Sequence, residues 1–140
     1  MSDPPVEPVP DNSGPSTILI VEPDILVRMV IAAYLRECGY TVVEGVTAAD
    51  AFTVLEAGRK IDVILAEVQL TGGVDGFALA RQVRESHPEI DVLLASGVRK
   101  AADEAGDLCE EGPLEKPYHP QEVVRRIRIL QERRRTRQKS

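Results

Sequence analysis

Short apolar runs and longer helical stretches alternate along this chain from Thr17 onward. Runs such as TILIVE at 17–22 and IDVILAEV at 61–68 are almost continuously apolar, which is typical of strands buried on both faces of a sheet. The stretches between them repeat apolar residues every three or four positions, which favours helices. The pattern predicts strands at 17–22, 41–46, 61–68, 91–96 and 112–117, and helices at 25–38, 47–58, 76–87, 98–108 and 120–135.

Capping residues stand at the ends of several predicted helices. Asp24 and Thr47 directly precede the first two, where a side-chain oxygen accepts a hydrogen bond from a free backbone N–H. Gly39 follows the first helix, as expected of a helix C-terminus, and Pro120 opens the last one. Gly106 interrupts the alanine-rich fourth helix and predicts a weak one.

Strands that alternate with helices predict an α/β fold in which helices cover both faces of a parallel sheet. In such a sheet, functional groups collect outside the carboxyl ends of the strands. The predicted strand ends place these polar residues at one edge: Glu22, Asp24, Glu67, Gln69, Ser96 and Lys116.

The 140 residues suit one domain with an extension at each end. Residues 1–16 hold five of the ten prolines and little to bury, so we predict a disordered leader there. We predict a domain over residues 17–131 and a basic tail over 132–140.

Charge is unevenly distributed along the chain. Residues 121–140 carry eight basic and two acidic side chains, and the other 120 residues carry 9 basic and 21 acidic ones. Such a basic end suits nucleic acid or anionic lipid. No aromatic residue interleaves its arginines, however, so we interpret it as a solvated helix end and do not expect nucleic acid as a partner.

Cellular location is predicted from the cysteines and from missing targeting signals. Cys38 and Cys109 have no metal-ligand spacing, and we predict two reduced, partly buried thiols. No apolar stretch approaches the length of a membrane span, and the N-terminus does not resemble a secretory signal. These features favour a cytoplasmic protein.

Four segments form the most specific pattern of the chain. They are ILIVEPDILVR at 18–28, DVILAEVQLTGGVDGFALA at 62–80, VLLASG at 92–97 and LEKPY at 114–118. Together they resemble the receiver domain of two-component response regulators, the family that includes the bacterial chemotaxis receiver. The resemblance runs from Thr17 to about Gln131, and it implies a flavodoxin-like (βα)5 sandwich with strand order 2-1-3-4-5.

The resemblance also implies a chemistry. In this family a histidine kinase phosphorylates an aspartate at the end of the third strand. Mg²⁺ is held by that aspartate, by acids after the first strand and by a backbone carbonyl. A hydroxyl and a lysine bind the phosphoryl oxygens, as charge developing on those oxygens requires. Glu22, Gln69, Ser96 and Lys116 match the positions of the first acid, the carbonyl, the hydroxyl and the lysine.

Three other positions depart from the family pattern. Glu67 stands at the acceptor position, Pro23 replaces the second acid after the first strand, and Pro113 replaces the aromatic residue that rotates on activation. Glutamate moves the nucleophilic oxygen by roughly 1 Å, and a misplacement of that size can cost about 10²-fold in rate. Losing an acid also weakens any Mg²⁺ site, for which Glu22, Glu67 and Gln69 remain the candidate ligands.

We therefore interpret the chain as a stand-alone, phosphorylation-independent pseudo-receiver rather than an enzyme. Glu67 is its pseudo-acceptor, Glu22 and Asp24 form an acidic pocket, Ser96 and Lys116 are the phosphoryl-site equivalents, and neither a cofactor nor a metal is assigned. The expected partner is a histidine kinase, a phosphotransferase, another response regulator or a second copy, bound on the face formed by helix 4, strand 5 and helix 5.

Two alternatives stay open. One is a single-domain response regulator that a histidine kinase still phosphorylates with Mg²⁺, on Glu67 or on another acid such as Asp24 or Asp75. The other is a protein that binds nucleic acid or lipid through its basic tail, with a steep dependence on salt.

Overall fold

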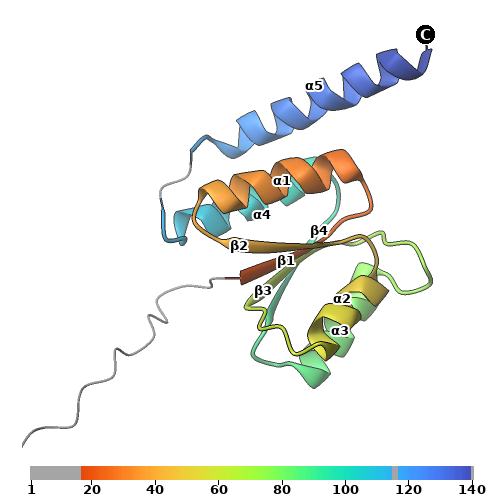
Figure 1. Cartoon of the computed structure of the whole chain (residues 1–140), viewed down its shortest axis with the longest axis vertical. Helices are drawn as coiled ribbons and strands as arrows, with labels where there is room; N and C mark the ends of the chain where they lie inside the picture. Colours follow the sequence, from red (N-terminus) through yellow and green to blue (C-terminus); the bar gives the residue numbers. More distant parts are fainter. Residues whose placement is uncertain (1–16, 115–116, 140) are drawn as a thin grey trace, which may run out of the picture.

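In the part of the chain that the structure describes, four parallel strands form the sheet (Figure 1). The computed structural model of the chain describes residues 17–114 and 117–139. The strands lie in the order β2-β1-β3-β4, which confirms the α/β, flavodoxin-like architecture. Their bounds are β1 Thr17–Val21, β2 Thr41–Gly45, β3 Val63–Glu67 and β4 Asp91–Ala95.

Five helices cover the two faces of this sheet. They are α1 Ile25–Glu37, α2 Ala48–Glu56, α3 Gly76–Ser86, α4 Val98–Glu110 and α5 Pro120–Lys139. In Figure 1, α2 and α3 lie on one face, α1 and α4 lie on the other, and α5 packs over α1 and α4. The predicted caps are confirmed, because Asp24 accepts hydrogen bonds at the start of α1 and Thr47 forms a capping box with Asp50 at the start of α2.

One apolar cluster lies on each face of the sheet, and β1 contributes side chains to both clusters. Ile18 and Ile20 face the larger cluster with α1, α4 and α5, whereas Leu19 and Val21 face the smaller one with α2 and α3. All four side chains are buried. Because successive side chains of a strand point to opposite faces, a strand covered on both sides must be apolar throughout, as its sequence is.

The fourth helix lies on the same face as α1, and this limits the sheet. A right-handed crossover that extended the sheet beyond β4 would place α4 on the face of α3. Instead, the chain after α4 runs to the end of α1, where the Leu114 nitrogen donates to the carbonyl of Cys38 (3.0 Å). Residues 112–114 of the predicted fifth strand form bends, while 115–116 lie outside the described residues. Within the described part of the chain, β4 is therefore an edge strand.

The prediction of two reduced thiols is wrong in this structure. Cys38 follows α1 and Cys109 lies in the last turn of α4, and the two form a buried disulfide with their Cα atoms 5.5 Å apart. The two cysteines are 71 positions apart in the sequence. Their spacing gave no sign of the bond because packing of α4 on α1 brings them together.

The predicted weakness of the fourth helix has a tertiary explanation. Helix α4 continues through Gly106 to Glu110. A β-carbon on Gly106 would lie 2.3 Å from the Cγ atom of Pro120, at the start of α5. Glycine at this position therefore permits α4 and α5 to approach each other closely.

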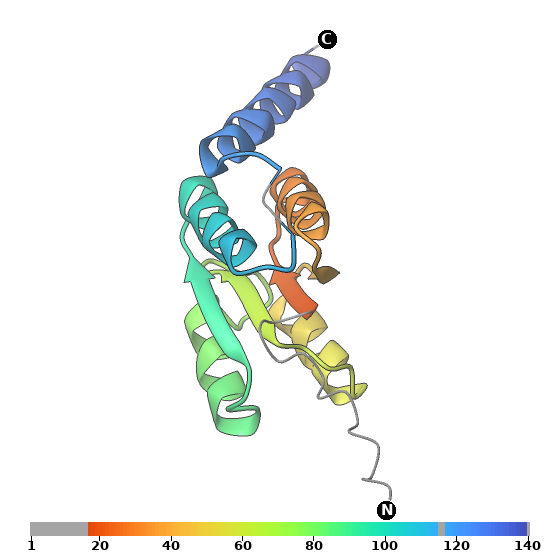
Figure 2. The ribbon, with the colours of Figure 1, turned by 90° about the vertical axis from the view of Figure 1, so that its left-hand side faces the viewer.

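Helix α5 is longer than the sequence pattern predicts, and it runs to Lys139. Its inner side buries Val123, Val124 and Ile127, while residues 132–138 are exposed. Figure 2 shows the helix extending past the rest of the protein. None of the helices in the described residues is both long and apolar enough to span a bilayer.

Candidate functional site

The carboxyl ends of β1, β3 and β4 meet at one edge of the sheet. Val21 pairs with Ala66, and Glu67 pairs with Ala95. This register places Glu22, Glu67 and Ser96 at the same edge, as the sequence predicts.

Glu67 connects the end of β3 to the start of α4. Its side chain is partly buried. One carboxylate oxygen, Oε2, accepts a hydrogen bond from the backbone nitrogen of Gly97 (3.1 Å), and Oε1 accepts a longer one from Gln69 (3.4 Å). Gly97 is the N-cap of α4, with φ at +91° and no side chain of its own to cap the helix. Glu67 therefore supplies a negative charge and an acceptor to the N-terminus of α4, where both are favourable.

Glu22 lies beneath the same edge in an environment that disfavours its charge. Burial, together with the nearby charges of Glu67 and Asp24, raises the pKa of its carboxyl group from 4.5 to about 7. The Asp24 backbone nitrogen, which donates to Glu22 Oε2 at 2.7 Å, and the Arg28 guanidinium act in the opposite direction. Glu22 is consequently close to half protonated at neutral pH.

Asp24 is occupied by structural contacts. Its Oδ1 atom accepts from the backbone nitrogens of Leu26 (2.8 Å) and Val27 (3.3 Å), which caps α1. Its Oδ2 atom lies 3.5 Å from Arg134 of α5. Both carboxylate oxygens of Asp24 are therefore engaged in structural contacts.

The acids at this edge are engaged in other contacts. Glu22 has its charge suppressed and one oxygen hydrogen-bonded, Asp24 caps α1, and both oxygens of Glu67 accept backbone hydrogen bonds. Residues 17–114 and 117–139 contain no group of three or more His, Cys, Asp or Glu side chains that could hold a metal ion. Within the described residues, these acids therefore do not fit the ligand set of a Mg²⁺ ion.

Three predicted site residues remain, namely Ser96, Gln69 and Lys116. Ser96 is exposed beside Gly97, and its hydroxyl makes no hydrogen bond to the residues that the structure describes. Gln69 is exposed in the loop after β3. Lys116 lies outside the described residues, so its role as a phosphoryl-site equivalent stays a prediction.

Two arginine contacts at this edge were not identified from the sequence. The Nη1 atom of Arg28 donates to the carbonyl of Glu22 (2.7 Å), and its Nε atom lies 3.3 Å from Glu44 on β2. Arg134 reaches Asp24 from α5. No local spacing in the sequence indicates either contact, because Glu44 lies on β2 and Arg134 lies on α5.

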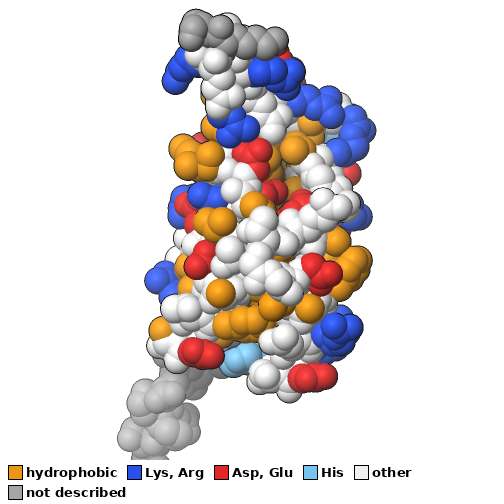
Figure 3. Space-filling model, turned by 90° about the vertical axis from the view of Figure 1, so that its right-hand side faces the viewer, with side chains coloured by type: hydrophobic (Ala, Val, Ile, Leu, Met, Phe, Trp, Pro, Cys, Tyr) orange, Lys and Arg blue, Asp and Glu red, His pale blue; other side chains and the backbone are white. Residues whose placement is uncertain are grey.

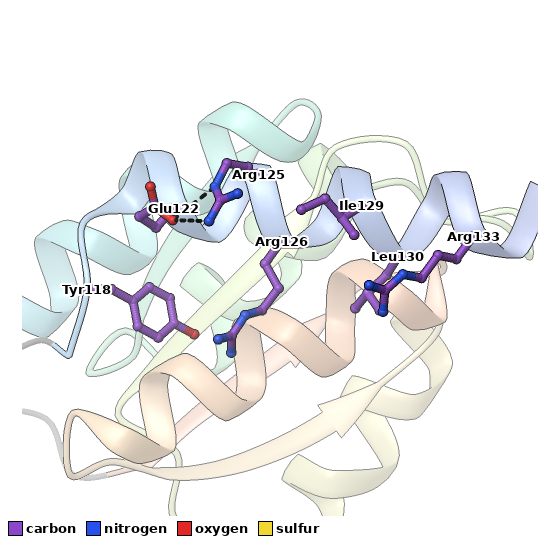
Figure 4. Close-up of a pocket in the computed structure, with 7 residues that line it drawn as sticks. All are labelled: Tyr118, Glu122, Arg125, Arg126, Ile129, Leu130 and Arg133. Carbon is purple, nitrogen blue, oxygen red and sulfur yellow. Dashed lines mark hydrogen bonds and ion pairs between the residues drawn. The ribbon is translucent and has the colours of Figure 1, made fainter.

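Aromatic packing lies at the opposite end of α1. Tyr118 packs against Tyr34 with their ring centroids 4.8 Å apart, and the Arg126 guanidinium lies 5.1 Å from the centre of the Tyr118 ring. Figure 4 shows Arg126 reaching from α5 toward Tyr118. Pro113 stands at the position of the family's mobile aromatic residue. It is exposed and has no aromatic side chain that could rotate.

Comparison with known proteins identifies one family. Residues 18–128 match the family described as the response regulator receiver domain. Sensor kinase CckA of Brucella abortus is 31% identical over 132 residues, covering 91% of this chain and 14% of that protein. The phosphate regulon transcriptional regulatory protein PhoB of Pseudomonas aeruginosa is 30% identical over 118 residues, covering 81% of this chain and 51% of that protein. The chain thus spans about half or less of the length of these relatives.

Solved structures show the same fold. A response regulator receiver domain protein from Clostridium thermocellum superposes with a TM-score of 0.55 at 20% identity, over 86% of this chain and 98% of that one. The receiver domain of an HD domain-containing protein from Pseudomonas fluorescens gives 0.57 at 23% identity, with the same coverage.

Proposed function

The chain belongs to the response regulator receiver domain family, and on this premise we propose that it signals through protein–protein contacts without being phosphorylated. Glu67, at the acceptor position, is the pseudo-acceptor in this proposal. The protein acts as a cytoplasmic interaction module, and its output is the binding of a partner rather than a catalysed reaction.

The hydrogen bond from Gly97 to Glu67 carries this proposal. It joins the acceptor position directly to the N-terminus of α4, so that the state of one is coupled to the position of the other. A permanent carboxylate at residue 67 imitates part of what a phosphoryl group would supply, since it carries one negative charge where a phosphate carries about −1.5 to −2. The contact therefore supports a module that is held in one signalling state.

The surroundings of Glu67 support the same interpretation. A working acceptor needs a metal and a free nucleophilic oxygen, whereas both Glu67 oxygens accept hydrogen bonds and the described residues contain no group of acids placed to hold a metal ion. The expected partner face includes α4 and α5, which pack against each other. A histidine kinase, a phosphotransferase or another response regulator is the partner class that the family implies.

The test compares wild type with Glu67→Gln, Glu67→Asp and the control Glu85→Gln, an exposed carboxylate on α3. Each protein is incubated with acetyl phosphate and Mg²⁺, and its intact mass is measured by mass spectrometry. Each protein is also used to capture partners from a cell extract. We expect no phosphoryl adduct on wild type, and we expect Glu67→Gln to lose a partner that wild type and Glu85→Gln retain. A stable adduct on wild type, or equal capture by all four proteins, would overturn the proposal.

A further inference from the structure

The outer side of α5 carries one exposed apolar side chain among arginines. Ile129 is 40% exposed. It is flanked on the helix by Arg125, Arg128 and Arg133, which lie one position or one turn away. Figure 4 shows Arg125, Ile129 and Arg133 along the helix. We call these four residues the α5 knob.

The charge of the α5 knob is only partly neutralised. Arg125 pairs with Glu122, and Glu132, which also lies on this side, pairs with Arg135. Arg128 and Arg133 have no ion-pair partner among the residues that the structure describes. The knob therefore has an apolar centre and a net positive surround.

The open edge of β4 offers a complementary surface. A groove of about 610 Å³ runs between this strand, the end of α3 and the second half of α4. Its apolar lining includes Ile90, Val92, Leu93 and Leu108. We call it the β4 groove.

Carboxylates dominate the walls of the β4 groove. Asp91, Glu104, Asp107 and Glu111 line it, against one arginine, Arg84. Glu104 is paired with Lys100, at 3.2 Å, whereas Asp107 and Glu111 are exposed. The groove therefore has an apolar floor and a net negative surround, the inverse of the α5 knob.

The edge of β4 also has free backbone groups. Asp91 donates its N–H to Asp62, and Ala95 accepts from Val68, so these two residues face β3. Since strand residues alternate, Val92 and Leu94 direct their N–H and C=O groups to the open side. An exposed strand edge promotes association. Pairing of two β4 edges would bring the carboxylates of the two grooves together, and these would repel each other. A positively charged partner surface is therefore favoured.

We propose that a second copy of this chain places its α5 knob in the β4 groove. Ile129 fills the apolar floor, and the arginines around it pair with Asp107 and Glu111 of the groove. A buried apolar centre ringed by charged pairs is the usual anatomy of a specific protein interface. The arginine stems also cover apolar surface while their charged ends stay at the rim.

The occupant must come from another copy because α5 is fixed in its own chain. The inner side of α5 is held in the core by Val123, Val124 and Ile127, which are buried. Ile129 is therefore left facing outward. Two such contacts related by a twofold axis close a dimer, whereas the same contact repeated without closure builds an open chain. This self-assembly goes beyond the proposed function, and it does not depend on the charge of Glu67, so the two proposals fail separately.

The experiment measures molar mass by light scattering at low salt for wild type and four variants. Ile129→Asp removes the centre of the knob, and Asp107→Arg with Glu111→Arg reverses the groove. Glu56→Arg on α2 and Arg59→Glu just after α2 are matched controls, because these exposed residues do not line the groove or lie near the knob. Circular dichroism checks that each variant folds.

We expect wild type and both controls to assemble, with an affinity that falls as salt is raised. The knob variant and the groove variant should each be monomeric or at least ten-fold weaker in assembly. Mixed together, they should form a 1:1 pair, because each retains the surface that the other lacks. A monomeric wild type, no pairing in the mixture, or controls that are disrupted as strongly as the groove variant would each overturn the proposal.

Discussion

Glu67 caps a helix to which it is not adjacent in the sequence. Its Oε2 atom accepts a hydrogen bond from the backbone nitrogen of Gly97, 30 positions later, at 3.1 Å. Gly97 adopts φ of +91° and has no side chain of its own to cap α4, so the end of β3 supplies the cap instead. The acceptor position and the first turn of α4 are thereby parts of one structural unit.

Removing this cap should loosen the start of α4. Glu67→Ala loses both the acceptor and the charge, and we expect it to lower the free energy of unfolding by about 1 kcal/mol. Glu67→Gln keeps an acceptor and should cost about half as much. Hydrogen exchange should accelerate in the first turn of α4 in the alanine variant. Unchanged exchange there would show that the bond contributes nothing to the helix.

The raised pKa of Glu22 predicts a specific dependence of stability on pH. The folded protein holds this proton up to about pH 7, whereas the unfolded chain releases it near the ordinary value of 4.5. The contribution of Glu22 to stability therefore falls as pH rises from 4.5 through 7. We expect Glu22→Gln to gain about 1–2 kcal/mol over wild type between pH 5 and pH 8, after allowance for solvent screening. Urea unfolding at several pH values measures this difference, and a constant difference would contradict it.

The contact between α4 and α5 predicts that even a methyl side chain at position 106 destabilises the protein. Gly106→Ala would place a β-carbon 2.3 Å from Pro120 Cγ, and we expect it to destabilise the fold by about 1–3 kcal/mol. Alanine otherwise favours a helix over glycine. Pro120→Ala removes that atom, so the double variant should be more stable than the sum of the single changes implies. Additive losses in denaturant unfolding would argue against the clash.

The disulfide predicts a large effect of reduction on stability. Cys38 and Cys109 close a loop across 71 positions, and constraining a loop of that length contributes about 4 kcal/mol. We expect dithiothreitol to lower the thermal midpoint of wild type and to leave the Cys38→Ser, Cys109→Ser double variant unchanged. Equal midpoints for oxidised and reduced wild type would contradict a structural role for the bond.

Local patterns in the sequence predicted the elements of this protein well. The strand 17–22 and the cap residues Asp24 and Thr47 are found where alternation and capping rules place them. The position of Glu67 at the end of β3 followed from the same rules. These features depend on neighbouring residues alone, so a single sequence contains the information needed to identify them.

The sequence by itself determined the class of fold and the edge at which Glu22 and Glu67 meet, and its resemblance to the receiver family implied the order of the first four strands. Tertiary structure alone decided that α4 lies on the face of α1, that Cys38 reaches Cys109, that Glu67 caps α4 and that Arg134 reaches Asp24. Each of these contacts joins residues at least 30 positions apart. Their formation depends on which surfaces become buried together, and local propensity does not specify that choice.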